Sequence, residues 1–447
     1  MRLQGSCKFR FANMMAMAAI AAIAMPVGLP AQANGAREQG AHEAGVPHYK
    51  LIDLGTLGGP NSFIAGPNIQ ILNDMGSLVG FANTAAANPN PNCFLPFQGP
   101  NDCFVYHPAV WRNGTLTDLG VLPGGINGQA DAIANNGLIV GWSEDGRIDP
   151  LLGLPEAHAV LWTQSGQIID LGALAGNESL ATAGNSRGQV VGFSSNDIPD
   201  SISLVGLPTQ TRAFLWQHGV LQDLSTLGGT DALAALINER GQVAGISYTN
   251  ADATTNPFFW QDGRMTDIGS LGGTSGMPYG LNDLGQVVGY SNLAGDATNH
   301  AFLWEHGTLT DLGTLGGDSS VAEAINNSGF MVGNADLPGS QSHHAFRMRI
   351  DGAMTDLGIV AAWPCTTALS VNARGQVVGD TGDCAGNDGP AFFSDHGEPM
   401  VDLNSLIVPA SDLEVIAAYD INDRGEIAGA AITPSGDEHA VLLIPCD

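Results

Sequence analysis

Two patterns of apolar and polar residues alternate along the chain from about residue 49 onwards. The first is an apolar run, a short polar turn and a second apolar run, as in residues 237–245, INERGQVAG. An Asn at the start of the turn and a Gly three residues later are typical of a type I turn closed by a residue with positive φ. The pattern therefore predicts a β-hairpin.

This hairpin recurs along the chain with a period of roughly 50 residues, which is in the range expected of β-propeller blades. Seven of the eight copies keep the turn Asn, and Ala134 replaces it in the second copy. The turn glycines of the eight copies are Gly76, Gly137, Gly188, Gly241, Gly285, Gly329, Gly375 and Gly425.

The second pattern is represented by residues 300–313, HAFLWEHGTLTDLG. Pairs such as His306-Gly307 separate an apolar arm from an arm that ends in Asp-Leu-Gly, as two-residue hairpin turns do. Consecutive apolar residues in the first arm predict a strand that is covered on both faces. Each repeat therefore predicts four strands, and Leu-Gly-Gly segments such as residues 57–59 predict the crossing to the next repeat.

The two ends of the repeat region complement each other. Residues 49–55 form an Asp-Leu-Gly arm without a partner, and residues 439–444 form the partner of such an arm. Pairing the first strand with the last leaves no open sheet edge, whereas an open solenoid would need polar caps at its ends. We therefore expect an all-β fold, an eight-bladed β-propeller of four-stranded blades that the N-terminal strand closes. The Asp-Leu-Gly strand is expected to lie outermost in each blade.

The Ala-Phe-Leu-Trp arms resemble a known family, the bacterial extracellular repeats named HAF after their His-Ala-Phe tripeptide. Residues 158–162 (HAVLW), 212–216 (RAFLW), 300–302 (HAF) and 344–346 (HAF) carry the resemblance, together with the Asp-Leu-Gly-x-Leu-Gly-Gly linkers. The resemblance implies secretion and tandem repeats, and it brings no catalytic residue or substrate. The copies that depart from the pattern replace the His with Arg212, Asn256 or Pro390 and the Trp with Met348, Ser394 or Leu443.

The N-terminal residues predict export. Arg2, Lys8 and Arg10 precede an apolar run over residues 14–27, and Ala-Gln-Ala follows at residues 31–33. This order is typical of a secretory signal peptide, and the apolar run is too short for a membrane span. We expect a signal peptide over residues 1–33, a flexible linker over 34–48 and a single β-propeller repeat domain over 49–447. The mature protein is then extracellular or periplasmic in a bacterium, without membrane insertion.

The charge balance narrows the range of partners. The chain has 15 basic and 44 acidic residues and a net charge of −29. Such a negative field repels the phosphates of nucleic acids and anionic membrane surfaces, so neither is an expected partner. Acidity mostly confers solubility, and binding of a divalent cation or a basic partner is the alternative interpretation.

Five cysteines follow the predicted signal peptide. Their short separations favour local disulfides between Cys93 and Cys103 and between Cys365 and Cys384, which leaves Cys446 unpaired. Because the sequence has no C-x-x-C pair, we do not predict a cysteine metal site.

The connections between the Val-Val-Gly arm and the Ala-Phe-Leu-Trp arm are longest in the first three copies, over residues 80–107, 141–158 and 192–212. Long loops on one face of a rigid scaffold are where ligands usually bind, although a disordered insertion explains them equally well. The acidic residues of the second and third connections are candidate ligand-binding residues: Glu144, Asp145, Asp149, Asp197 and Asp200.

Other residues that suggest chemistry have structural explanations. Residues 184–188, GNSRG, match the G-x-S-x-G motif, but a strand follows where a nucleophile elbow needs a helix. Equivalent His residues on neighbouring packed sheets lie about 10 Å apart, too far to share one zinc ion. We therefore expect hydrogen bonding for the repeated His, acceptance of backbone N–H groups for the repeated Asp and packing between blades for the repeated Trp. These residues are His107, His158, His300, His344 and His439; Asp118, Asp170, Asp223, Asp267, Asp311, Asp356 and Asp402; and Trp111, Trp162, Trp216, Trp260 and Trp304.

Taken together, these patterns favour a secreted, non-enzymatic binding or scaffold module for an extracellular carbohydrate or protein ligand. The alternative is a secreted hydrolase or lyase that acts on an extracellular polysaccharide or other polymer with acidic residues of the long connections. No catalytic residue and no cofactor are predicted. Calcium binding by Glu144, Asp145 and Asp149 is weakly indicated, since their spacing does not fit an EF-hand loop.

Overall fold

The computed structural model describes residues 47–89, 103–339 and 342–446. The predicted signal peptide, nearly all of the predicted linker and Cys93 lie outside these residues. The described chain is built of β-strands with two short 3-10 helices, η2 (Asn250–Asp252) and η3 (Leu403–Leu406). Within the described ranges no helix is both long and apolar enough to cross a membrane.

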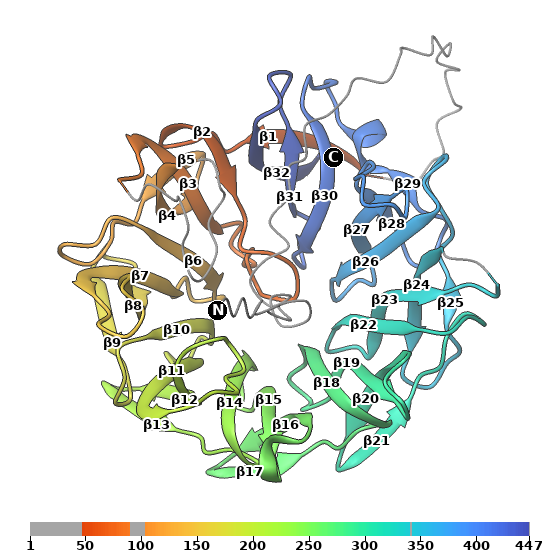
Figure 1. Ribbon diagram of the computed structural model, residues 1–447. Helices are drawn as coiled ribbons and strands as arrows, with labels where there is room; N and C mark the ends of the chain where they lie inside the picture. The colour runs from red at the N-terminus through yellow and green to blue at the C-terminus, as the bar shows by residue number, and fades with distance from the viewer. Residues whose placement is uncertain (1–46, 90–102, 340–341, 447) are drawn as a thin grey trace, which may run out of the picture.

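Antiparallel strands that follow one another along the chain form the sheets, and Figure 1 shows these sheets arranged around a common axis. Over the described residues, six sheets have four strands and one has eight. The eight-stranded sheet consists of two antiparallel groups, which a single parallel bridge between Thr255 and Ser275 joins.

The strands, grouped by the antiparallel set to which they belong, have the following bounds. They are β2 (Gly58–Phe63), β3 (Leu78–Ala87), β4 (Phe104–Arg112) and β5 (Thr115–Asp118); β6 (Gly128–Ile133), β7 (Ile139–Ile148), β8 (Pro155–Trp162) and β9 (Ile168–Gly172); β10 (Ser179–Gly184), β11 (Val190–Pro199), β12 (Thr209–Gln217) and β13 (Val220–Asp223); β14 (Gly228–Ile237), β15 (Val243–Thr249), β16 (Thr255–Gln261) and β17 (Arg264–Asp267); β18 (Gly272–Leu281), β19 (Val287–Leu293), β20 (Asn299–Glu305) and β21 (Thr308–Asp311); β22 (Ser320–Ile325), β23 (Phe330–Asp336), β24 (His343–Arg349) and β25 (Thr355–Asp356); β26 (Cys365–Val371), β27 (Val377–Gly382), β28 (Phe392–Ser394) and β29 (Val401–Asp402); and β30 (Glu414–Ile421), β31 (Ile427–Ile432), β32 (Glu438–Cys446) and β1 (His48–Asp53).

The strand order within a sheet follows the chain, for example β10-β11-β12-β13. In Figure 1 the first strands, such as β10 and β22, lie near the axis, and the last strands, such as β13 and β25, lie at the rim. This confirms that the Asp-Leu-Gly arm is outermost. The crossings are shorter than predicted, because Gly58, Gly228 and Gly272 already begin β2, β14 and β18.

The two ends of the described chain meet in one sheet. Strand β1 pairs antiparallel with β32 along its whole length, from His48 opposite Cys446 to Asp53 opposite Val441. Tyr49 is fully buried in this sheet, and its ring packs edge-on against that of Phe393 at a centroid distance of 5.9 Å. In Figure 1 the red end of the chain accordingly lies beside the blue end.

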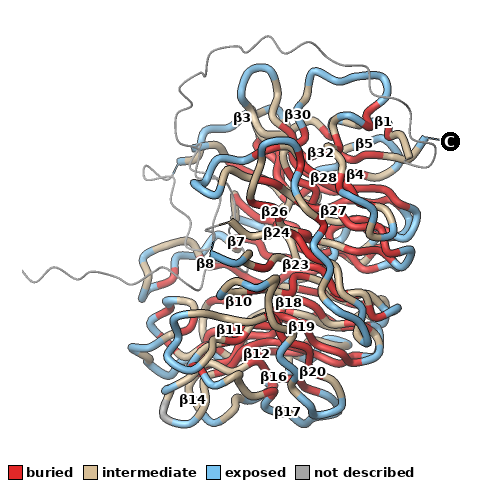
Figure 2. Tube along the Cα trace, turned by 90° about the vertical axis from the view of Figure 1, so that its right-hand side faces the viewer, coloured by how far each residue is buried: buried red, intermediate tan, exposed pale blue. Residues whose placement is uncertain are grey.

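The core lies within and between the sheets, as the buried segments in Figure 2 show. The Phe residues of the Ala-Phe-Leu-Trp arms, including Phe214, Phe302 and Phe346, are fully buried. Burial of each such side chain contributes about 1.5–3 kcal/mol to stability. Trp304 is buried against Phe259 of β16, with ring centroids 4.8 Å apart. At this position the Trp packs between the two antiparallel groups of the eight-stranded sheet.

The glycine of each Val-Val-Gly arm is required by a close backbone approach. A Cβ atom at Gly192 would lie 1.9 Å from the carbonyl oxygen of Leu180, and one at Gly289 would lie 1.9 Å from that of Met277. The innermost strand bulges at this point, between Ala181 and Ala183 in β10. A side chain on the second strand would therefore collide with the innermost strand.

The side-chain amides of the turn asparagines link neighbouring sheets. Asn238 Nδ2 donates to the backbone carbonyl of Asn282 at 2.9 Å. Asn238 Oδ1 accepts hydrogen bonds from the backbone N–H groups of Arg240 and Gln242 in its own turn. One side chain therefore fixes its own turn and also binds the next sheet. The same bond to the next turn is made by Asn73, Asn185, Asn282, Asn326, Asn372 and Asn422.

In the repeat that lacks the turn Asn, a nearby asparagine makes the hydrogen bond to the next turn. Ala134 has no amide to donate, but Asn136, two residues later, donates from Nδ2 to the carbonyl oxygen of Ser186 at 2.9 Å. At the ends of the series, Asn422 Nδ2 donates to the carbonyl oxygen of Asn73 at 3.0 Å, across a sequence separation of 349 residues. The series therefore links the last turn to the first.

We predict that Asn238→Ala lowers the free energy of unfolding by about 1–3 kcal/mol, because it leaves buried backbone groups without their partners. Asn238→Asp keeps the acceptor oxygen but places a second oxygen against the Asn282 carbonyl, so it should also destabilise the protein. Urea denaturation at pH 7 measures both changes. Stability equal to that of the wild type in both variants would contradict a structural role for the amide.

Candidate functional site

The five candidate acidic residues lie in two neighbouring hairpins, three of them in or directly after β7 and two in or directly after β11. The second long connection is not a loop, which corrects the sequence analysis. Strands β7 and β8 continue past a register shift that separates the Glu144 and Ile148 pairs, and only a short turn joins them. Glu144 and Asp145 therefore lie in β7, and Asp197 lies in β11.

Three of the five candidates, Glu144, Asp145 and Asp200, do not line the cavity described below. Glu144 is buried, and its carboxylate accepts hydrogen bonds from the backbone N–H groups of Ile126 and Asn127 and from Asn127 Nδ2. It thus holds the crossing that leads into β6. Asp200 Oδ1 accepts a hydrogen bond from the backbone N–H of Ile202 and stabilises its own turn.

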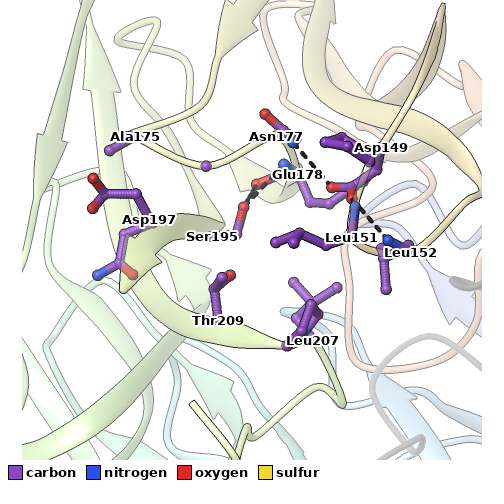
Figure 3. Close-up of a pocket in the computed structure, with 14 residues that line it drawn as sticks. Asp149, Leu151, Leu152, Ala175, Asn177, Glu178, Ser195, Asp197, Leu207 and Thr209 are labelled. Carbon is purple, nitrogen blue, oxygen red and sulfur yellow. Dashed lines mark hydrogen bonds between the residues drawn. The ribbon is translucent and has the colours of Figure 1, made fainter. Parts of the chain in front are cut away.

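Asp149 and Asp197 line a cavity of about 190 Å³ between the ends of the two long hairpins. Figure 3 shows them on opposite sides of this cavity, with Leu151 and Leu207 between them. Ile198, beside Asp197, is an exposed apolar side chain. The cavity thus combines carboxylates with aliphatic walls. We name it the β7–β11 cavity.

One buried carboxylate of the cavity has an oxygen without a hydrogen-bond partner. Glu178 also lines the cavity, is only 1% exposed, and has one carboxylate oxygen, Oε1, without a hydrogen-bond partner. The other oxygen accepts from the backbone N–H of Ala157 at 2.9 Å. Burial, together with the nearby carboxylates of Asp149, Glu156 and Asp145, raises the pKa of Glu178 to about 8. A positive group in this region would be stabilised by all of these carboxylates.

The repeated His and Asp residues have the structural roles that the sequence predicts. His300 Nδ1 lies 2.9 Å from Asp311, and Asp311 Oδ1 accepts from the backbone N–H of Gly313. Where Asn256 replaces the His, its Nδ2 donates to Asp267 in the same way. Equivalent pairs are His107–Asp118, His158–Asp170, His344–Asp356 and His439–Asp53, and the hydrogen bond from His439 lowers the pKa of Asp53.

The other sequence motifs also have structural outcomes. The GNSRG segment is a hairpin turn, in which the backbone N–H of Gly188 donates to the carbonyl oxygen of Asn185 before β11 begins. The predicted disulfide between Cys365 and Cys384 is confirmed, with Cα atoms 5.3 Å apart. Cys446 is an exposed free thiol.

Sequence analysis missed a set of residues that face the axis. At the bulge of the innermost strands, the side chains differ between repeats and include Asp131, Tyr279 and Glu323. Burial raises the pKa of Asp131 to about 8 and that of Glu323 to about 7. Asn68 Nδ2 donates to Glu323 at 2.9 Å, across a sequence separation of 255 residues. In the sequence, Asp131 and Glu323 could each have been found as a single acidic residue inside an otherwise apolar arm, ADAI at residues 130–133 and VAEAI at residues 321–325.

Comparisons with known proteins do not identify a family. No protein-family model matches the sequence, and no curated protein matches it. A similar solved structure is the β-propeller domain of the Trilobed protease from Pyrococcus furiosus, described as having an open Velcro topology; it is 8% identical, covers 77% of this chain and 98% of its own, and has a TM-score of 0.45.

Two further solved structures are similar. A protein assigned as TolB from Agrobacterium tumefaciens is 13% identical, covers 69% of this chain and 99% of its own, and has a TM-score of 0.33. A protein assigned as a gluconolactonase is 15% identical, covers 52% of this chain and 81% of its own, and has a TM-score of 0.29. The arrangement of antiparallel sheets around an axis places the protein in the β-propeller class.

The buried carboxyls predict that stability falls as pH rises from about 5 to 8. In the unfolded chain a Glu ionises near pH 4.3, whereas folded Glu178 keeps its proton up to about pH 8. Between these values the folded state binds more protons, so its stability is complete below the lower pKa and is lost as pH rises through the higher one. Each such group contributes a slope of up to about 1.4 kcal/mol per pH unit.

Urea denaturation across this pH range measures the slope. Glu178→Gln should flatten it, whereas the same change at Glu414, an exposed residue, should leave it as in the wild type. A slope that Glu178→Gln does not alter would refute the protonation of this residue in the folded protein.

Proposed function

We propose that the protein is a secreted, non-enzymatic binding module whose ligand site is the β7–β11 cavity. The observation that carries the proposal is the cavity itself, which lies between the ends of two long hairpins and has carboxylates on aliphatic walls. Propeller loops commonly carry binding sites, because a rigid scaffold positions them. The Cys365–Cys384 disulfide supports secretion, since disulfides persist in oxidising compartments.

The chemistry of the cavity favours a basic side chain of a partner protein as the ligand. Asp149 and Asp197 supply negative charge, and Glu178 Oε1 supplies a buried oxygen without a hydrogen-bond partner. Leu151, Leu152 and Leu207 supply walls for an aliphatic stem. A lysine side chain has this combination of a charged head and an apolar stem. The chain's net charge of −29 would also steer a basic partner towards it.

We predict that the purified full chain binds lysine-rich peptides on an array, and that Asp197→Asn weakens this binding at least about tenfold, because the cavity would lose its exposed carboxylate and the charge contact with the lysine. Asp412→Asn is the matched control, because it removes the same charge from an exposed loop distant in sequence from the cavity. Peptide titrations followed by fluorescence anisotropy measure the affinities.

The same preparation is incubated with polysaccharides and proteins to test for turnover. Binding that Asp197→Asn weakens and Asp412→Asn spares, without turnover, supports the proposal. Release of product from any polymer would overturn the non-enzymatic assignment. Equal weakening by both variants would show a general charge effect and would overturn the cavity as the binding site.

We further propose that the sheets form an eight-bladed propeller, in which the eight-stranded sheet counts as two blades and β1 closes the ring. Two observations support this. The two halves of the eight-stranded sheet share one bridge, and each half repeats the four-strand order of the other sheets. The turn amides also continue from the last turn to the first through Asn422 and Asn73.

Deleting residues 49–55 should lower the melting temperature and promote aggregation, because β32 would lose its antiparallel partner and expose an open edge. A deletion of equal length within residues 34–46 serves as the control. Calorimetry and size-exclusion chromatography report the two effects. A monomer that melts at the wild-type temperature after removal of residues 49–55 would contradict closure by β1.

A further inference from the structure

We propose that Asp145, Glu156 and His158 form a binding site for a divalent transition-metal ion, with Zn²⁺ as the best fit. Strands β7 and β8 bring the three residues together, because Glu144 pairs with Ala157 in their ladder. One ligand atom from each residue lies within 4.8 Å of the others. None of the three lines the β7–β11 cavity, so the proposal stands independently of the proposed function.

His158 is oriented as a metal-binding histidine. Its Nδ1 lies 2.9 Å from Asp170, which fixes the ring and leaves Nε2 facing Asp145 Oδ2 at 3.9 Å. Histidines that bind metals usually hold a carboxylate with their other ring nitrogen in this way. The hydrogen bond between His158 and Asp170 is one that other repeats also make. Only the two carboxylates of Asp145 and Glu156 are therefore particular to this site.

Glu156 carries a buried carboxylate oxygen that has no hydrogen-bond partner and is neutralised by the Arg147 ion pair. Its side chain is only 7% exposed, and its Oε2 atom accepts no hydrogen bond. Arg147 Nε lies 2.9 Å from that oxygen, but the Nε–H group is directed to Asp145 Oδ2 instead. A buried carboxylate oxygen without a hydrogen bond is costly unless a cation neutralises it.

The position of Arg147 shows that the side chains of Asp145, Glu156 and His158 attract a positive charge. Its guanidinium contacts Asp145, lies against Glu156 and approaches His158 Nε2 at 3.4 Å. The Arg147 side chain is 63% exposed, in contrast to the buried groups that it covers. It can therefore swing into solvent and leave the three ligand atoms to an ion.

The donor set selects the kind of ion. One imidazole nitrogen and two carboxylates suit Zn²⁺ and similar transition metals, whereas Ca²⁺ and Mg²⁺ favour oxygen ligands alone. Zinc bonds of about 2.0–2.2 Å require the ligand atoms to close to on the order of 3–4 Å from one another. Small side-chain rotations after Arg147 leaves would provide this closure.

The repeat also provides matched variants. His300 makes the same bond to Asp311, and its neighbours on β19 and β20 provide no such carboxylate pair. Asn256 shows that an Asn at this position keeps the bond to the Asp of the next strand. His158→Asn therefore removes the ligand nitrogen and retains the repeat hydrogen bond, and His300→Asn is its control.

The experiment titrates the metal-free full chain carrying Cys446→Ser with Co²⁺, whose visible absorption reports coordination, and then with Zn²⁺ as competitor. We expect one ion per chain, at least tenfold tighter binding in Arg147→Ala, and loss of binding in His158→Asn and Glu156→Gln. His300→Asn should bind as the parent does. Far-ultraviolet circular dichroism confirms that each variant is folded.

Two outcomes would overturn the site. One is the absence of Co²⁺ and Zn²⁺ binding in both the parent and Arg147→Ala. The other is unchanged affinity in folded His158→Asn, which would assign the ion to other residues. Peptide binding is measured separately on the same variants, so failure of the metal site leaves the test of the β7–β11 cavity intact.

Discussion

The bond from a turn asparagine to the backbone carbonyl of the next sheet sets the relative position of the sheets. In Asn282, Nδ2 reaches the Asn326 carbonyl at 3.0 Å while Oδ1 holds the backbone of its own turn. Each such bond contributes on the order of 1 kcal/mol, but the bonds are repeated around the axis and are mostly shielded from water. Because they fix how far apart adjacent turns lie, they also determine which hairpin ends meet on the opposite face.

That geometry explains why the unusual chemistry gathers between two particular sheets. Strands β3, β7 and β11, the second strands of three successive sheets, are each ten residues long. The hairpin ends of β7 and β11 line one cavity. Asp145 and Asp149 come from one hairpin, and Asp197 comes from the other. The repeat supplies His158 with its Asp170 partner, and the extension supplies the added carboxylates. A His–Asp pair that the repeat supplies and a longer hairpin with added carboxylates thus combine in one region.

Sequence patterns predicted the elements that depend on local chemistry. The Asn-x-x-Gly turns and the order of the four strands depend on residues within one repeat. Hydrogen bonding of the repeated His and acceptance of backbone N–H groups by the repeated Asp were also predicted, but not that the two side chains pair with each other. Contacts between repeats were not predictable, since nothing in the Asn282 turn itself names Asn326 as its partner. Asp145 and Asp149 were predicted as candidates, whereas Glu156 was missed because the predicted loop hid the pairing of β7 with β8. Glu178 was missed because it lies in the crossing before β10, outside the long connections.

The pairing of β1 with β32 has a consequence for biosynthesis. Asp53 is translated almost four hundred residues before its partner Val441, and domains otherwise tend to fold from their N-terminal end as the chain emerges. The other sheets are assembled from consecutive strands, each complete soon after it is made. The sheet that holds β1 is thus finished last, and until the final strand emerges the earliest one must stay apart from the growing structure.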